Sequence, residues 1–108
     1  MWTVVYLAEA ERERDALSAR ERNALYNAIT KLQALGPDLG YPHTSAVQDA
    51  ERLRELRPRA GRSPCRALYR QVGVRFVIAA IGPEAQHDPK RFKRACGAAA
   101  VRLGELEE

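Results

Sequence analysis

The sequence is poor in the residues from which metal sites and disulfide frameworks are built. Its 108 residues include only two cysteines, two histidines and one tryptophan. Cys65 and Cys96 lie 31 positions apart, without a CxxC motif or a Cys/His ligand spacing. We therefore expect reduced thiols packed in the fold, with no metal site and no cofactor.

Long apolar runs are also absent. The apolar run that begins at Trp2 ends after about six residues, which is too short for a signal peptide or a membrane span. We expect a cytoplasmic protein with no membrane partner. A chain of 108 residues, 45% of them apolar, suits one globular domain over residues 1–108 with a single modest core.

Positive charge is concentrated in one stretch, Arg52 to Arg75, which we call the arginine segment. It holds eight arginines and one acid, Glu55, so its net charge of +7 exceeds the +4 of the whole chain. Guanidinium groups stay charged near neutral pH and bind phosphate through paired hydrogen bonds. The segment therefore indicates nucleic acid as the leading partner, and a solvated sheet face that happens to be rich in arginine is the alternative.

The first half of the chain predicts one strand and then two helices. Trp2 to Leu7 is rich in β-branched and aromatic residues, as strands are. Ala8 to Leu17 is a strong helix former, and Ser18 with Glu21 forms a capping-box pattern that opens a second helix ending at Leu35. The buried stripe of this second helix is predicted to be Leu25, Ala28, Ile29, Leu32 and Leu35. Gly36 to Asp49 is rich in Gly, Pro and Asp, which is typical of an irregular connection.

The second half predicts three short strands and a helix. The strands lie near Arg54 to Arg59, Cys65 to Val72 and Val74 to Gly82, and the short links between them predict an antiparallel meander. Asp88 and Pro89 predict the start of a third helix. Its apolar stripe is Phe92, Ala95, Cys96, Ala99, Leu103 and Leu106. The order is β-α-α-β-β-β-α, an α+β fold with helices packed on an antiparallel sheet.

Four segments spread over nearly the whole chain carry a resemblance to a known family. They are the short first strand, LGPDLGYPHT after the second helix, LRELRP with RALYR in the arginine segment, and the strand that ends before the helix begun by Asp88-Pro89. These segments resemble the RelE/HigB superfamily of bacterial toxins, in particular its phage-derived Gp49-like branch. The resemblance implies a RelE-like fold and the toxin of a type II toxin–antitoxin pair. It also implies an endoribonuclease that cleaves mRNA, commonly on the ribosome, and a cognate antitoxin, which we expect to be a helix-turn-helix protein.

RNA cleavage without a metal uses the ribose 2′-OH as nucleophile, and it needs charge stabilisation on the phosphorane and proton transfer. Arg57 and Arg66 match the arginines of the family motifs, and we assign them to phosphate binding and to stabilisation of the transition state. His87, Lys90 and Tyr69 are the candidates for proton transfer. RNA contacts are predicted for a further set, Arg54, Arg59, Arg62, Arg70 and Tyr69. For Tyr69, packing in the core is the alternative to stacking on a base.

One segment departs from the family pattern. Relatives typically follow the last strand with a phenylalanine and a pair of lysines, whereas this chain has Ile81-Gly82-Pro83-Glu84-Ala85-Gln86-His87-Asp88. A second hypothesis therefore stays open, a non-catalytic module that binds nucleic acid or protein on the same fold. A third is a structural subunit whose arginines meet an acidic partner protein.

Overall fold

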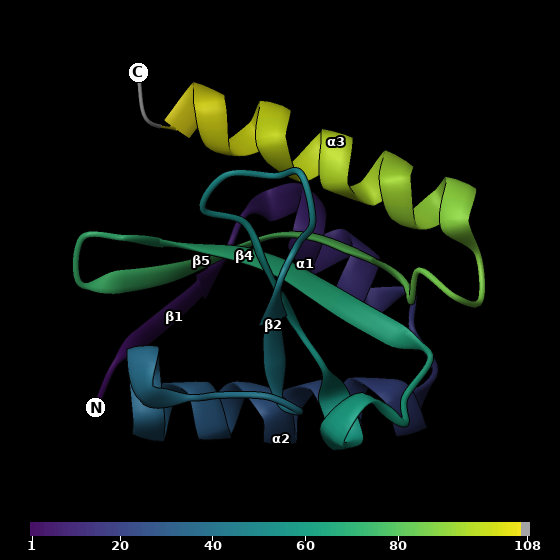
Figure 1. Ribbon diagram of the computed structural model, residues 1–108. Helices are drawn as coiled ribbons and strands as arrows, with labels where there is room; N and C mark the ends of the chain where they lie inside the picture. Colours follow the sequence, from purple (N-terminus) through teal and green to yellow (C-terminus); the bar gives the residue numbers. More distant parts are fainter. Residues whose placement is uncertain (107–108) are drawn as a thin grey trace.

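The fold is a five-stranded sheet with helices on both faces, in a computed structural model that describes residues 1–106 (Figure 1). The strands are β1 (Thr3–Tyr6), β2 (Thr44–Ala46), β3 (Arg54–Leu56), β4 (Cys65–Val72) and β5 (Arg75–Pro83). The helices are α1 (Ala8–Asp15), α2 (Ala19–Leu35) and α3 (Pro89–Leu106), with 3₁₀ turns η1 (Gly36–Asp38) and η2 (Pro58–Gly61). This confirms the α+β class. Within residues 1–106, no helix has the length and apolar character that crossing a bilayer requires.

The strands lie in the order β1-β5-β4-β3-β2. The predicted meander of β3, β4 and β5 is confirmed, and β2 extends it with a further antiparallel pair. β1 is the exception, because it pairs with β5 in parallel. The chain reaches this arrangement by passing through α1 and α2 before it enters the meander, so the first strand joins the sheet beside the last.

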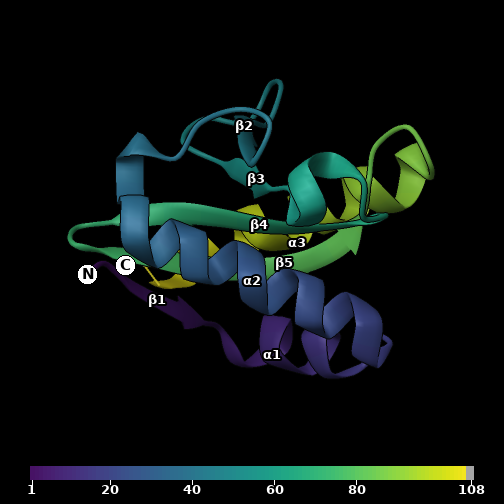
Figure 2. The same ribbon diagram turned by 90° about the horizontal axis from the view of Figure 1, so that it is seen from below.

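The two faces of the sheet are covered by different helices. α2 lies on one face and α3 lies on the other, whereas α1 lies beside the edge of the sheet formed by β1 and the end of β5, as the two views in Figures 1 and 2 show. In β5, Phe76 and Ile78 pack toward α1 and α2, whereas Val77 and Ala79 pack toward α3. A strand covered on both sides needs apolar residues at successive positions, and this confirms the interpretation of β5 as a central strand.

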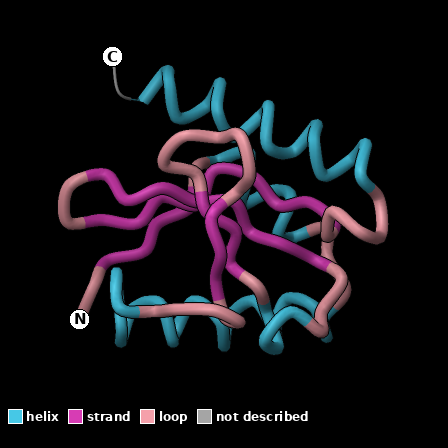
Figure 3. Tube along the Cα trace, viewed as in Figure 1, coloured by secondary structure: helices cyan, strands magenta, loops and turns pink. Residues whose placement is uncertain are grey.

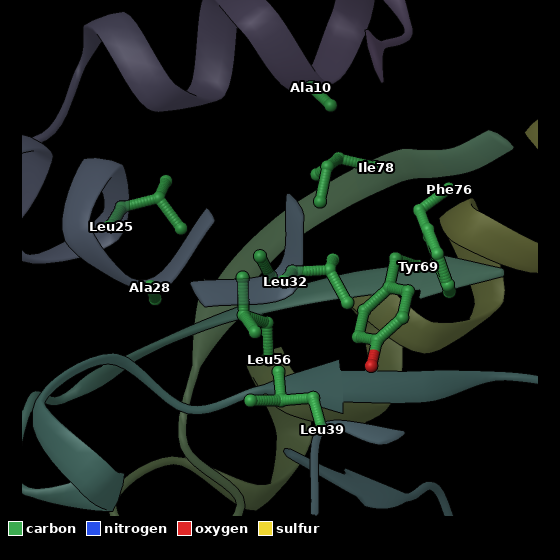
Figure 4. Close-up of a cluster of buried hydrophobic side chains, with 10 residues drawn as sticks. Ala10, Leu25, Ala28, Leu32, Leu39, Leu56, Tyr69, Phe76 and Ile78 are labelled. Carbon is green, nitrogen blue, oxygen red and sulfur yellow. The ribbon is translucent and has the colours of Figure 1, made fainter. Parts of the chain in front are cut away.

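The main core lies between α2 and the sheet (Figure 4). Leu25 and Leu32 are fully buried there, Ala28 is buried, and Ile29 is half-buried against them, as the helical spacing predicts. Leu35 is 49% exposed, contrary to the prediction, because the helix ends there and the chain turns away through η1. Leu39, which follows η1, is buried in the cluster instead.

The third helix begins as predicted. The Asp88 carboxylate accepts a hydrogen bond from the backbone N–H of Arg91 at 3.1 Å, and Ala99 and Leu103 are fully buried on the sheet. The prediction for Leu106 is wrong, since this residue of the last turn is 49% exposed. α3 approaches β5 closely, because a Cβ added at Gly82 would lie 2.7 Å from the Cβ of Ala95.

The connection after α2 is more ordered than predicted. Within Gly36 to Asp49 the structure forms β2, anchored by the buried Thr44, whose hydroxyl donates to the Glu55 carbonyl at 3.0 Å. Residues 47–53 then form a loop beside α3, drawn pink in Figure 3. β3 is shorter than predicted because Pro58 starts η2, in which Arg59 and Ala60 both have a positive φ of 56°.

A salt bridge closes the free edge of β5. β1 ends at Tyr6, opposite Ile78, so the later residues of β5 have no strand on that side. There the Glu13 carboxylate accepts from the Ile81 N–H at 3.0 Å, and Arg102 donates to the Ala79 carbonyl at 2.8 Å. Glu13 and Arg102 also pair through two bonds of 3.1 Å, which ties α1 to α3 around the strand.

Candidate functional site

The strand register brings the ends of β3 and β5 and the start of β4 to one end of the sheet. Leu56 lies opposite Ala67, and Ala67 lies opposite Ile81. The residues that follow β3 and β5 therefore meet the residues that open β4. In this way Arg57, Arg66 and Glu84 come from positions far apart in the sequence to line one pocket. The end of β5, which precedes Glu84, leads into α3 (Figure 1).

A single carboxylate lies between the two arginines that the family motifs single out. Glu55 Oε1 accepts from Arg57 Nη1 at 3.0 Å and lies 3.4 Å from Arg66 Nε. Glu55 is the one acid of the arginine segment, and its side chain is only 12% exposed. Two cations that would otherwise repel each other are therefore held together by a shared negative group.

Arg57 is the accessible member of this pair. Its side chain is 20% exposed, its Nε donates to the Pro42 carbonyl at 3.0 Å, and its guanidinium lies over the exposed Tyr41 ring, 5.1 Å from the centroid. Leu56 points to the core and Arg57 to the opposite side of the strand, as predicted. The guanidinium is thus fixed by a carbonyl, a carboxylate and a ring while it still reaches solvent.

Arg66 is buried, with 3% of its side chain exposed. It donates to the carbonyls of Ser63 at 2.6 Å, Cys65 at 2.9 Å and Gly61 at 3.2 Å, and to Glu84 Oε2 at 2.9 Å. Its Nε makes no hydrogen bond, although Glu55 is near enough for an ion pair. Direct phosphate binding by Arg66 does not fit this burial. Its contacts instead hold the turn before β4 and fix both glutamates.

The backbone of η2 makes this arrangement possible. Gly61 has φ of 92°, and a Cβ added there would lie 2.5 Å from Arg57 Nη2. Glycine suits the left-handed backbone here, and its missing side chain leaves the space that the end of the Arg57 side chain fills. The same turn directs the Gly61 carbonyl to Arg66.

These side chains line an open pocket of about 360 Å³, which we call the arginine pocket. Its walls are Tyr41, Glu55, Arg57, Gly61, Arg66, Glu84, Ala85 and Gln86. Two arginines and two glutamates face it, so its formal charge is balanced. The attraction of Arg57 for an entering anion is therefore partly offset by Glu55 beside it.

The other predicted arginines divide into two groups. Arg59 and Arg62 are exposed in and beside η2, close in sequence to Arg57. Arg54 is half-buried and donates to the Thr44 hydroxyl at 3.3 Å. Arg70 lies elsewhere, with bonds to the carbonyls of Glu51 at 3.1 Å and Arg52 at 3.4 Å. Neither Arg59 nor Arg62 lines the arginine pocket, and Arg59 lines a separate hollow of about 150 Å³ with Arg57 and residues of α2.

Tyr69 is part of the core, which was the alternative to its predicted RNA contact. The side chain is 2% exposed, its ring packs edge-on against Phe76, and its hydroxyl is hydrogen-bonded to that of Thr44 at 2.7 Å. A ring so enclosed cannot stack on a base or transfer a proton to substrate. The prediction of Tyr69 as an RNA-binding residue is wrong.

The two remaining candidates for proton transfer do not line the arginine pocket. His87 is exposed beside a different hollow of about 490 Å³, together with Glu13, Glu21 and Cys65. Lys90 is exposed in the first turn of α3. The titratable carboxylates that do line the pocket are Glu55 and Glu84, neither of which was predicted. The signal available for Glu55 was its position as the single acid among eight arginines.

Thiol and metal chemistry have little support in the described part of the chain. Both cysteines are free, and burial raises the pKa of Cys65 to about 11, with the nearby Glu21 adding to the effect. Burial also raises the pKa of Cys96. Both thiols are thus protonated near neutral pH and pack as predicted. Residues 1–106 contain no group of three His, Cys, Asp or Glu side chains that could hold a metal ion.

Comparison with known proteins gives a family and a fold. Residues 12–81 match the family model of phage-derived Gp49-like proteins. A search of curated proteins gives no match. The matched residues include α2 and four residues of the arginine pocket, namely Tyr41, Glu55, Arg57 and Arg66. They end at Ile81, before Glu84 and α3.

Solved structures of toxins share the fold. The isolated E. coli RelE toxin matches with a TM-score of 0.62 and 14% identity, over 87% of this chain and 98% of that one. A mutant of E. coli RelE in the free state matches with a TM-score of 0.63 and 14% sequence identity, over 87% of this chain and 93% of that one. A chain of the chromosomal ParDE TA system from P. aeruginosa matches with a TM-score of 0.61 and 16% sequence identity, over 77% of this chain and 96% of that one. The predicted RelE-like fold is confirmed.

Proposed function

The chain belongs to the family of phage-derived Gp49-like proteins, and on that premise we propose that it is the toxin of a type II toxin–antitoxin pair. Its activity is that of an mRNA endoribonuclease, a hydrolase that works on the ribosome. The observation that supports this activity best is the arginine pocket, where a guanidinium and a carboxylate lie 3.0 Å apart in an open hollow of the RelE fold.

Three side chains of the pocket have separate roles in a metal-free cleavage, which are charge stabilisation, proton transfer and positioning. Arg57 binds the scissile phosphate and stabilises the charge that develops on the phosphorane. Glu55 accepts the proton of the attacking 2′-OH. Arg66 is a positioning residue, because its bonds fix both the turn and the carboxylates around it. Tyr41, exposed and held over Arg57, offers a ring on which a base can stack.

The leaving 5′ oxygen needs a proton donor. His87 and Lys90 keep this role as predictions, since both are exposed in or just after the segment that contains Glu84. Glu84, in its protonated form, is the alternative within the pocket. The exposed Arg59 and Arg62 extend the contact with the RNA backbone.

Inducible expression in a bacterial host tests the proposal. We expect growth arrest with cleavage of transcripts for the parent, and recovery of growth for Arg57→Ala and for Glu55→Gln. Purified Glu55→Gln should cleave mRNA about 10² to 10⁴ times more slowly, the usual contribution of a positioned base. Its affinity for RNA should not fall, because a negative charge beside the phosphate has been removed.

Arg75→Ala is the matched control, because Arg75 belongs to the arginine segment but lies at the far end of β5. It should remain toxic. Unaffected growth in the presence of soluble parent protein would rule out the toxin assignment.

A non-catalytic binding module is the second candidate. It is favoured by Glu84, which accepts a hydrogen bond from Arg66. This acid lies in a segment where relatives typically carry a phenylalanine and two lysines. Protein that binds RNA or ribosomes without cleaving mRNA would support this candidate.

The proposed partners follow from the proposed activity. They are mRNA, the ribosome and a cognate antitoxin, which we propose to be a helix-turn-helix protein encoded beside this chain. A cytoplasmic location follows from the substrate.

A further inference from the structure

Four cations gather at the start of α3, in a part of the chain beyond the family match. They are Lys90, Arg91, Lys93 and Arg94, which we call the α3 surface, and all four are exposed. Between Pro89 and Gly104 the helix contains no acid. The match to Gp49-like proteins ends at Ile81, so these residues lie outside the matched range.

The four side chains have no partner within residues 1–106, in hydrogen bonds or in ion pairs. Several other arginines of the protein form ion pairs. Arg14, Arg57, Arg66 and Arg102 each pair with a carboxylate, and Arg102 belongs to the same helix. The α3 surface is therefore a group of cations that the fold itself does not use.

Their position opposes helix stability. Positive side chains are unfavourable at a helix N-terminus, where the backbone dipole already presents positive charge. The spacing adds repulsion, since Lys90 has Lys93 three residues on and Arg94 four residues on. Helix formation thus gives no reason for this cluster. A bound anion would offset both effects.

From these observations we propose that the α3 surface is a second RNA-binding surface, which contacts the phosphate backbone outside the arginine pocket. The proposal rests on the proposed function for the nature of the partner, but on separate residues. The segment Glu84 to Gln86 lines the arginine pocket, and α3 begins at Pro89. In this proposal, a strand of RNA whose scissile phosphate lies at Arg57 continues along the first turns of α3.

An acidic protein fits the α3 surface less well than RNA does. Phe92, Ala95 and Cys96, the apolar residues between the cations, are half-buried against the sheet. Phe92 and Cys96 line a hollow of about 630 Å³ with residues of the 47–53 loop, beside Lys93, whereas the other cations of the α3 surface lie outside that hollow. Binding to a phosphate backbone needs charge alone.

The test compares two variants of the full chain with equal net charge. One is Arg91→Gln/Lys93→Gln/Arg94→Gln, which leaves Lys90, a candidate for proton transfer, in place. The control is Arg12→Gln/Arg20→Gln/Arg75→Gln, which removes three exposed cations from α1, α2 and the start of β5. Binding is measured by fluorescence anisotropy with a labelled 2′-O-methyl RNA, which cannot be cleaved through a 2′-OH, at several salt concentrations. Ribosomes programmed with the same RNA form the second target.

We expect the α3 variant to bind at least about tenfold more weakly, and its slope of log affinity against log salt to be shallower by about 2, since each phosphate contact to a single strand contributes about 0.7. The control should change affinity by less than about threefold, an unspecific effect of net charge. The α3 variant should also melt no lower than the parent, because repulsion within the helix has been removed.

Equal affinity and equal slope for the two variants would overturn the inference, even if the parent cleaves mRNA. A variant that loses affinity only for the antitoxin would also overturn it, in favour of an acidic protein partner. A parent that binds neither the RNA nor the programmed ribosomes would overturn the inference together with the proposed function.

Discussion

The two arginines of the family motifs have different physical roles, although their chemistry is the same. Arg66 is enclosed by three carbonyls and a carboxylate, whereas Arg57 is one-fifth exposed above the pocket. Removal of a buried ion-pair partner leaves the other charge uncompensated, but a partly exposed pair contributes little to stability. Loss of Arg66 should therefore abolish activity because the site loses its structure, whereas loss of Arg57 should abolish activity because the pocket loses its contact with phosphate.

We predict that Arg66→Ala lowers the free energy of unfolding by about 3 kcal/mol, because Glu55 and Glu84 lose the cation between them. Arg57→Ala should lower it by roughly 1 kcal/mol or less and still abolish mRNA cleavage. Urea unfolding followed by circular dichroism measures the first effect, and a cleavage assay on folded protein measures the second.

Arg62→Ala serves as the control, since Arg62 is exposed and makes one side-chain bond, to the Arg59 carbonyl at 3.1 Å. It should change stability by less than about 0.5 kcal/mol. If Arg66→Ala proved as stable as Arg62→Ala, its network would not be structural, and Arg66 would return as a candidate for phosphate contact.

At the scale of elements, the free edge of β5 shows how helices substitute for a missing strand. Glu13 from α1 and Arg102 from α3 satisfy the backbone of Ile81 and Ala79, which β1 is too short to reach. Unpaired strand edges promote association between molecules. The salt bridge thus serves stability and solubility together.

We predict that Arg102→Ala destabilises the protein by roughly 1 to 3 kcal/mol, the cost of a buried carbonyl and a carboxylate left without their donor. The same variant should aggregate faster on mild heating. Chemical unfolding and light scattering measure the two effects. The control is Arg94→Ala on the same helix, which should leave both unchanged, since Arg94 is exposed. Equal aggregation of the two variants would exclude the protective role of the edge contact.

Most elements followed from local sequence signals, and the exceptions have physical causes. Periodicity predicted α2 and α3, because one face of each is buried on the sheet. β2 escaped prediction since a three-residue strand is stabilised by its neighbours, here through the buried Thr44, and not by its own propensity. Leu35 and Leu106 fit their stripes but lie in the last turns, where the helix no longer faces the core.

The candidate site was predicted only in part for the same reason. Arg57 followed from strand alternation and the family motif. The roles of Glu55 and Glu84 depend on register, because they meet Arg66 only when β3, β4 and β5 are aligned. Arg66 and Tyr69 are buried, which the sequence did not predict for Arg66 and left open for Tyr69. The burial of a single polar residue depends on the tertiary fold and has no local sequence signal.

At the scale of the molecule, charge is divided between regions. Residues 1–51 carry a net charge of −3, the arginine segment +7, and residues 76–108 none. The acidic first part includes α2, which covers the face opposite α3, and α1, which lies beside the edge of the sheet at β1 (Figure 2). Such an asymmetry orients approaching polyanions at long range and raises association rates at low salt.

This asymmetry makes a prediction about how an antitoxin silences the protein. An acidic antitoxin segment that covers the arginine pocket and the neighbouring η2 turn gains attraction from the exposed Arg59 and Arg62, whereas docking on α1 does not. We predict that association of the antitoxin encoded in the neighbouring frame slows about tenfold or more as salt rises to physiological strength and above. Arg59→Glu/Arg62→Glu should slow it further, by about tenfold at low salt. Arg66 is left unchanged because a carboxylate there would unfold the site.

The matched control reverses the same number of charges on the helices, in Arg12→Glu/Arg20→Glu. Stopped-flow fluorescence gives the association rate for both variants. If the pocket is the docking site, the control slows association by less than about threefold, because distant charges are screened beyond roughly 10 Å. If both variants associate at the rate of the parent, charge does not guide the antitoxin to this face. It then docks on α1 and α2, and inhibition follows from added bulk and not from a covered pocket.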